Sequence, residues 1–141
     1  MHVLVRADAS SQIGLGHLMR CRSLSRALRH EGAEVRFCGR MPDGSVREDF
    51  SKEFQLISLT SVKELSIDPA NGSWLPVSEC DDARLTQMAV EADGEWRPDW
   101  IVVDHYGISA LWHQQIRDAW PSVRIAVIDD LADRPQSPDL L

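Results

Sequence analysis

The sequence is poor in several residue types, and each shortage narrows the possible functions. Lys52 and Lys63 are the only lysines among 15 basic residues, against 22 acidic residues, so the formal net charge is −7. Nucleic-acid-binding proteins usually carry a basic stripe, and this balance argues against that class. No apolar run approaches the roughly 18 residues of a membrane-spanning helix. We therefore expect neither nucleic acid nor a membrane as a partner.

Cysteine is also scarce, and its spacing is uninformative for metal or disulfide chemistry. Cys21, Cys38 and Cys80 are odd in number, and no pair has the CxxC spacing of a redox or zinc motif. Cys21 falls on an apolar helical stripe and Cys38 ends an apolar strand pattern, so both are expected to be buried. The chain also enters a strand pattern without a signal segment. These features predict a cytoplasmic protein.

Hydrophobic periodicity predicts strands that alternate with helices. The 141 residues, 43% of them hydrophobic, suffice for one domain with its own core. Strands are expected at 2–6, 34–38, 54–59, 100–103 and 123–128, and helices at 16–31, 46–53, 79–92 and 110–120. Residues 60–76 are predicted to be loop because proline and glycine accumulate there. This alternation predicts an α/β fold with a parallel, doubly wound sheet.

Spacings of three and four residues predict which helical side chains face the core. In the first helix these are Leu18, Cys21, Leu24 and Leu28. In the later helices they are Leu85, Met88, Ala92, Leu111, Ile116 and Ala119.

Polar residues gather where the predicted strands end, which is the edge at which parallel sheets bind ligands. They are Asp8 with the loop 14–17, Gly39 with Arg40, Thr60 with Ser61, the run 104–106, and Asp129 with Asp130. Carboxylates at strand ends also cap the helices that follow, so a ligand site and simple capping both remain open. For His105, a hydrogen bond to the backbone is favoured over contact with a ligand.

The segment 13–21 joins the first strand to the first helix and places His17 in the first helical turn. Free backbone N–H groups and the helix dipole favour an anionic group at this end. The same dipole disfavours a proton on His17, so we expect a neutral imidazole able to act as a base near pH 7. A dinucleotide fingerprint is incomplete, because Met19 stands at the third glycine position and no acidic residue ends the second strand. That argues against NAD or FAD.

Four segments resemble, in the same order, the UDP-sugar hydrolases of pseudaminic acid biosynthesis. They are RADASSQIGLGHLMRC at 6–21, Trp74-Leu75 followed by Asp82-Ala83, DHYGI at 104–108, and IDDLADR at 128–134. The resemblance implies a GT-B-like two-domain fold, with this chain as the Rossmann-like, sugar-facing N-terminal domain. It further implies hydrolysis of UDP-2,4-diacetamido-2,4,6-trideoxy-β-L-altropyranose to UDP and the free sugar, without a cofactor or metal.

The resemblance also implies a set of site residues. The histidine that matches His17 is the base, and the tyrosine that matches Tyr106 lies at the same site. Together with the strand-end residues, this predicts that the substrate is bound by Asp8, Gly14, Gly16, Arg20, Asp104 and His105.

The chain departs from the family pattern in two places. Pro76 follows Trp74-Leu75 where the family commonly has glycine, and the chain stops at Leu141, where a second half would begin. We therefore expect a C-terminal nucleotide-binding domain to be the missing partner. An uncovered apolar face and an unpaired strand edge near Leu140 would also favour weak self-association.

Two other function classes remain open. A metal-dependent hydrolase would use Asp8, His17, Asp104 and Asp129 as ligands, although no HxH or HExxH spacing supports it. The second alternative is a non-catalytic module that binds a nucleotide sugar, or a truncated glycosyltransferase-like module.

Overall fold

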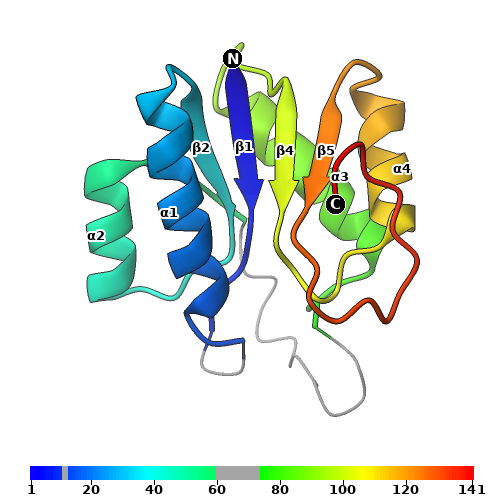
Figure 1. Ribbon diagram of the computed structural model, residues 1–141, viewed down its shortest axis with the longest axis horizontal. Coiled ribbons are helices and arrows are strands. Elements are labelled where there is room, and N and C mark those ends of the chain that lie inside the picture. The colour runs from blue at the N-terminus through cyan, green and yellow to red at the C-terminus, as the bar shows by residue number, and fades with distance from the viewer. Residues whose placement is uncertain (11–12, 60–73) are drawn as a thin grey trace.

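A computed structural model describes residues 1–10, 13–59 and 74–141. The described residues form a five-stranded sheet in the order β3-β2-β1-β4-β5, with every pair of neighbouring strands parallel. Helices α1 and α2 cover one face of this sheet, and α3 and α4 cover the other (Figure 1). The protein therefore has the Rossmann-like, doubly wound α/β fold that the sequence predicts.

The elements lie close to their predicted positions. The strands are β1 (His2–Arg6), β2 (Glu34–Gly39), β3 (Gln55–Ser58), β4 (Trp100–Val103) and β5 (Arg124–Val127). The helices are α1 (Gly16–His30), α2 (Ser45–Glu53), α3 (Glu79–Ala92) and α4 (Ala110–Ala119). Residues 60–73 of the predicted loop, including Thr60 and Ser61, lie outside the described residues, as do Ser11 and Gln12.

Two apolar layers hold the helices against the sheet. Val3 and Val5 of β1 pack with Phe37 and Phe50 on the α1 and α2 side. Alternate residues point to the other face, where Leu4 belongs to the cluster around Trp112. Burying apolar surface on both faces is typical of parallel sheets, and it leaves the strand ends as the place for polar groups.

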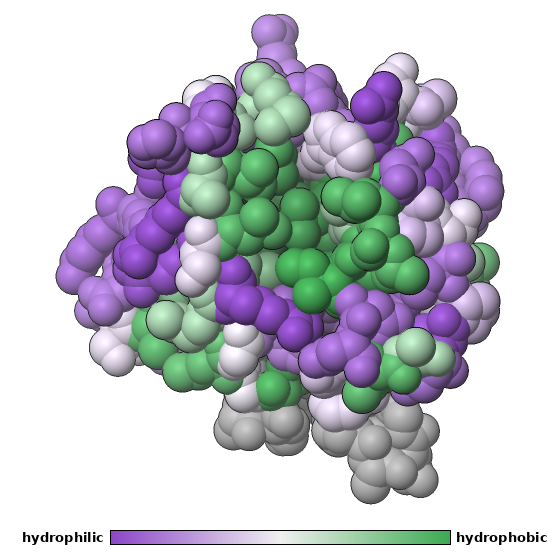
Figure 2. Space-filling view, viewed as in Figure 1, coloured by the Kyte–Doolittle hydropathy of each residue, from purple (hydrophilic) through white to green (hydrophobic). Residues whose placement is uncertain are grey.

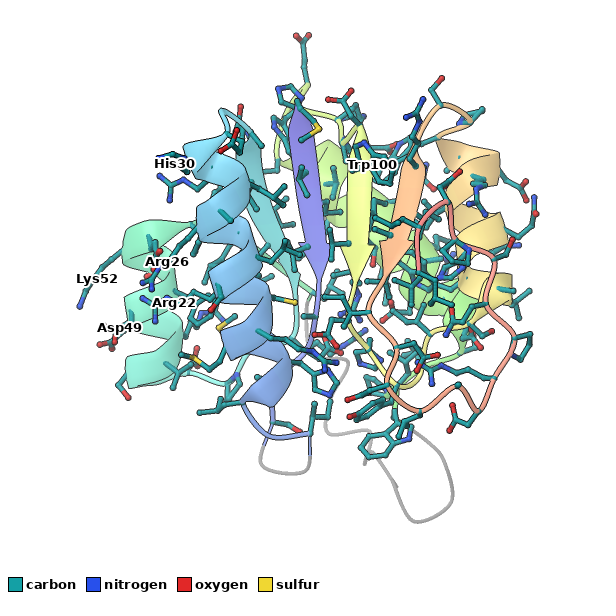
Figure 3. The ribbon with its side chains drawn as sticks, in the orientation of Figure 1. Arg22, Arg26, His30, Asp49, Lys52 and Trp100 are labelled. Carbon is teal, nitrogen blue, oxygen red and sulfur yellow. The ribbon has the colours of Figure 1, made fainter. Side chains whose placement is uncertain are left out.

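An ionic contact joins the two helices that share one face of the sheet. Arg22 and Arg26 of α1 reach toward α2 in Figure 3, and both guanidinium groups bind the Glu53 carboxylate. The Arg22 guanidinium also stacks over the Phe50 ring, with its carbon 5.0 Å from the ring centroid. The pair α1–α2 is therefore fixed by charge and by packing on the side of α1 away from β4.

The other side of α1 borders a part of the sheet that no described helix covers. The prediction that Leu24 is buried is wrong: Leu24 is 36% exposed, and Ser25 is buried in its place. Leu24 lines a groove of about 500 Å³ together with Leu28, Trp100 and Ala126. Figure 2 shows the apolar surface of this face between α1 and the C-terminal segment.

Three further inward-facing assignments are wrong, and one of them is Ala92, which is exposed at the end of α3. Met88 of α3 is 57% exposed and Leu111 of α4 is 51% exposed, whereas Thr86, Trp112 and His113 are buried. Helices α3 and α4 pack against each other as well as against the sheet, so their buried stripes are turned toward the helix–helix contact.

The C-terminal residues lie beside β5. Leu140 forms a parallel bridge with Ala126, and the Val127 N–H donates to the Leu140 carbonyl at 2.8 Å. Arg117 of α4 holds the same segment through Asp139 at 2.9 Å. Leu140 is therefore paired on the side that faces β5, and the expectation of an unpaired edge concerns its other side. Within the described ranges, no helix is both long enough and apolar enough to cross a bilayer.

His113 of α4 makes the stability of the fold depend on pH. Burial, and secondarily the charge of Arg117, lower the pKa of His113 from 6.5 to about 4, and its Nδ1 accepts the Ser137 N–H. Its neutral form stabilises the fold fully above pH 6.5, and this contribution is lost as pH falls toward 4. At about 1.4 kcal/mol per pKa unit, the loss is about 3 kcal/mol.

We predict that His113→Gln reduces the drop in unfolding free energy between pH 7 and pH 4 by about that amount. Urea unfolding at the two pH values measures it. His30→Gln is the control, because the His30 side chain is 87% exposed. Equal pH profiles for His113→Gln and the wild type would contradict the assignment.

The apolar groove predicts weak self-association that strengthens as pH approaches the pI of about 5.1, where charge repulsion fades. Leu24→Asp should abolish it by placing a charge in the groove. Leu111→Asp, which adds the same charge on exposed α4, should not. Sedimentation velocity at several concentrations measures the self-association of the wild type and both variants. A wild-type protein that stays monomeric from pH 5 to 8 would contradict the prediction.

Candidate functional site

The loop after β1 brings the start of α1 to the carboxyl edge of the sheet. The Ser10 carbonyl accepts the Gly14 N–H at 2.8 Å and the Ser10 hydroxyl accepts the Ile13 N–H at 3.0 Å, so Ser10 is held against the residues that lead into α1. Gly14 has a φ of +80°, which a side chain would strain. A Cβ at Gly14 or Gly16 would meet no atom of the described residues within 4 Å, so a ligand could approach this backbone closely.

His17, in the first turn of α1, is held by Asp104 at the end of β4. The ring is 5% exposed, and its Nδ1 hydrogen-bonds the Oδ1 of Asp104. A carboxylate only accepts, so this bond requires a proton on Nδ1, and in the neutral ring the lone pair is then on Nε2. Arg20 Nη2 also lies 3.3 Å from Nδ1. Among the residues described, none binds Nε2. In its neutral form, His17 therefore presents the lone pair of Nε2 at this edge of the sheet.

Arg20, one turn further along α1, binds the same carboxylate. Its Nε and Nη2 each donate to Asp104 at 2.5 Å, and its Nη1 donates to Asp130 at 3.2 Å. Burial opposes ionisation of Asp104, but hydrogen bonds from Arg20 and His17 outweigh it and hold the pKa of Asp104 below its ordinary value. Asp104 is therefore a carboxylate at neutral pH, able to stabilise a positive charge on His17.

Tyr106 completes this group. Its ring meets His17 edge to face with centroids 4.5 Å apart. Burial, followed by the charge of Asp130, raises the pKa of Tyr106. A side-chain hydrogen bond to Asp130 raises the same pKa, so the phenol keeps its proton beside His17.

Asp8 and His105 form a second pair next to the first. His105 Nε2 lies 3.0 Å from Asp8, and His105 Nδ1 accepts the Gly107 N–H at 3.0 Å. Asp8 is 2% exposed and also binds Arg6 and Arg40. Burial opposes its ionisation, but Arg6 and His105 hold the pKa of Asp8 well below its usual range. Both side chains are saturated by protein partners, which favours a role in positioning the strand-end loops.

Sequence reasoning missed the charges beneath Asp8. Arg6 is fully buried and binds Asp82 at 2.9 Å, and Arg40 binds Asp82 at 2.7 Å. The Trp112 indole N–H donates to the same carboxylate at 3.0 Å. An arginine inside an apolar strand was the available signal, because such a charge needs a buried acid. Nothing in the sequence separates Asp82 from its neighbour Asp81 as that acid.

The predicted site residues thus fall into two adjoining groups. His17, Arg20, Asp104 and Tyr106 meet directly, with Gly14 and Gly16 in the loop beside them. Asp8 and His105 belong to the neighbouring group. The four residues of the metal alternative do not converge, and within the described ranges no three His, Cys, Asp or Glu side chains form a metal-binding group.

Known proteins add nothing to this geometry: neither a scan of protein-family models nor a search of curated proteins found a match to the chain.

Asp82→Asn should lower the free energy of unfolding by about 3–5 kcal/mol, because two arginines then share the single charge of Asp8 in the interior. Asp81→Asn is the matched control, since Asp81 is exposed and its loss should cost less than about 0.5 kcal/mol. Urea unfolding at pH 7 compares the two variants. Similar losses in both would show that the buried cluster is not what holds these strand ends.

Proposed function

We propose that this chain is the sugar-facing domain of a UDP-sugar hydrolase. The substrate would be UDP-2,4-diacetamido-2,4,6-trideoxy-β-L-altropyranose, and the products UDP and the free sugar of pseudaminic acid biosynthesis. The observation that carries the proposal is the His17–Asp104 pair, in which the contact through Nδ1 leaves Nε2 of the neutral ring free to accept a proton at the carboxyl edge. The substrate and the GT-B-like two-domain context come from the sequence resemblance.

The proposed reaction is an inverting displacement by water. His17 Nε2 takes a proton as the water oxygen bonds to the anomeric carbon. The bond from that carbon to the phosphate oxygen breaks, and its electron pair leaves with UDP. Asp104 keeps the ring oriented through Nδ1 and stabilises the imidazolium that forms.

The surroundings of His17 suit a phosphorylated sugar. In the first turn of α1, the N–H groups of Gly16, His17 and Leu18 bind no acceptor among the described residues, and no acidic side chain occupies that turn. Such a helix start favours an anionic oxygen. Tyr106 can hold the attacking water or a sugar hydroxyl. Arg20 acts through Asp104, which it keeps ionised.

The second candidate is a module that binds a nucleotide sugar without cleaving it. One observation favours it: the hollow of about 490 Å³ at the ends of β1, β2 and β3 is lined by Arg40 and Arg47 and does not include His17. A ligand held there would be bound away from the base.

His17→Ala should lower kcat at least about a hundredfold, the usual effect of losing a general base. Asp104→Asn should also slow turnover strongly, because it removes the acceptor that fixes the imidazole tautomer. UDP release is the measurement, in protein that carries both the present chain and a C-terminal half. The present chain alone should fold but release little UDP.

His30→Ala provides the control, since His30 lies at the far end of α1 and is exposed. If His17→Ala keeps a kcat near that of the wild type, His17 is not the base. Tight binding of the nucleotide sugar with no UDP release by the wild type would favour the binding module instead.

A further inference from the structure

An aromatic group continues outward from His17 through three separate segments. His17 starts α1, Tyr106 follows β4, and Trp74 precedes α3. The Tyr106 ring meets Trp74 with centroids 5.0 Å apart and an interplanar angle of 61°, in addition to its contact with His17. The two larger rings therefore form a continuous surface next to the proposed base.

Packing against Gly107 sets the position of Trp74. A Cβ added at Gly107 would lie 3.0 Å from the Trp74 Cβ and 2.9 Å from the Leu75 Cγ. Since real Cβ contacts are longer, residue 107 must lack a side chain for the Trp74 segment to sit where it does. The turn 105–107 thus holds Tyr106 and Trp74 together.

Trp74 differs from Trp112 and Trp120, which pack in the apolar cluster on the α3 and α4 side. The indole N–H groups of Trp112 and Trp120 donate to Asp82 and Glu91. Trp74 is only half-buried, and its N–H has no acceptor within residues 1–10, 13–59 and 74–141. The surface made by Trp74 and Tyr106 therefore combines apolar ring area with an indole N–H and a phenol that stays protonated.

A pyranose has the matching chemistry. Its C–H groups form apolar faces that stack on aromatic rings, and its hydroxyl and acetamido groups accept hydrogen bonds at the ring margin. A nucleobase also stacks on aromatic rings. However, if His17 activates the attacking water, the group next to it must carry the anomeric carbon, which is the sugar.

We propose that Trp74 and Tyr106 form the platform that binds the sugar ring of the substrate and sets specificity for it. This inference rests on the proposed function for the identity of the ligand. Trp74 is a binding residue that orients the anomeric carbon toward His17, and Gly107 positions Trp74.

The test is ligand-observed saturation-transfer NMR on the full 141-residue chain, with N-acetyl-D-glucosamine and UDP as separate probes. The wild type should transfer saturation to the C–H protons of the sugar. Trp74→Leu should weaken sugar binding about tenfold and leave UDP binding unchanged. Gly107→Ala should have the same effect while keeping both aromatic rings. Trp120→Leu, which removes a distant tryptophan, should bind the sugar like the wild type.

Circular dichroism melting confirms that each variant is folded, and Gly107→Ala keeps the test decisive if Trp74→Leu does not fold. The proposal is overturned if the wild type binds no sugar, or if both Trp74→Leu and Gly107→Ala bind it like the wild type. These readouts are independent of hydrolysis. If sugar binding depends on Trp74 while the protein that carries both halves releases no UDP, that result would contradict the proposed hydrolase activity but would still support the sugar-binding platform.

Discussion

The parallel pairing of β1 with β4 is the constraint on which the site depends. Arg6 lies opposite Val103 in this register, so the two strands end at the same level and an aspartate follows each of them. The segment after β1 supplies His17 to Asp104, and the segment after β4 supplies His105 to Asp8. Each strand end is thus tied to the other by a histidine, and a shift in register would break both pairs at once.

Arginines allow these carboxylates to stay ionised in the interior. Asp104 is paired with Arg20, and Asp8 with Arg6 and Arg40. Placing unpaired carboxylates this deep would cost several kcal/mol or force them to take up protons. A protonated Asp104 would no longer serve as a full acceptor for His17. The charge balance therefore supports the chemistry proposed for the imidazole.

Periodicity and strand-end position predicted the fold and the edge at which the polar groups gather, because both depend on local pattern. They did not predict which partners meet. His17 and Asp104 are 87 positions apart, and only the order of strands in the sheet brings them together. Leu24 and Leu111 were misplaced because the face a helix buries depends on what packs beside it. Arg6 within an apolar strand indicates that an acidic partner is buried beside it. Whether Asp81 or Asp82 is that partner depends on the orientation of α3.

The histidine after each of the two strands binds the aspartate after the other strand, and the two contacts predict opposite tautomers for His17 and His105. Asp104 accepts from Nδ1 of His17, whereas Asp8 accepts from Nε2 of His105. Long-range ¹H–¹⁵N correlation of the histidine rings at pH 8.5 measures this directly. We expect a protonated Nδ1 in His17 and a protonated Nε2 in His105, and we expect Asp104→Asn to change the pattern of His17 alone. A His17 ring that carries its proton on Nε2 in the wild type would contradict the role proposed for His17, because no lone pair would then face the substrate.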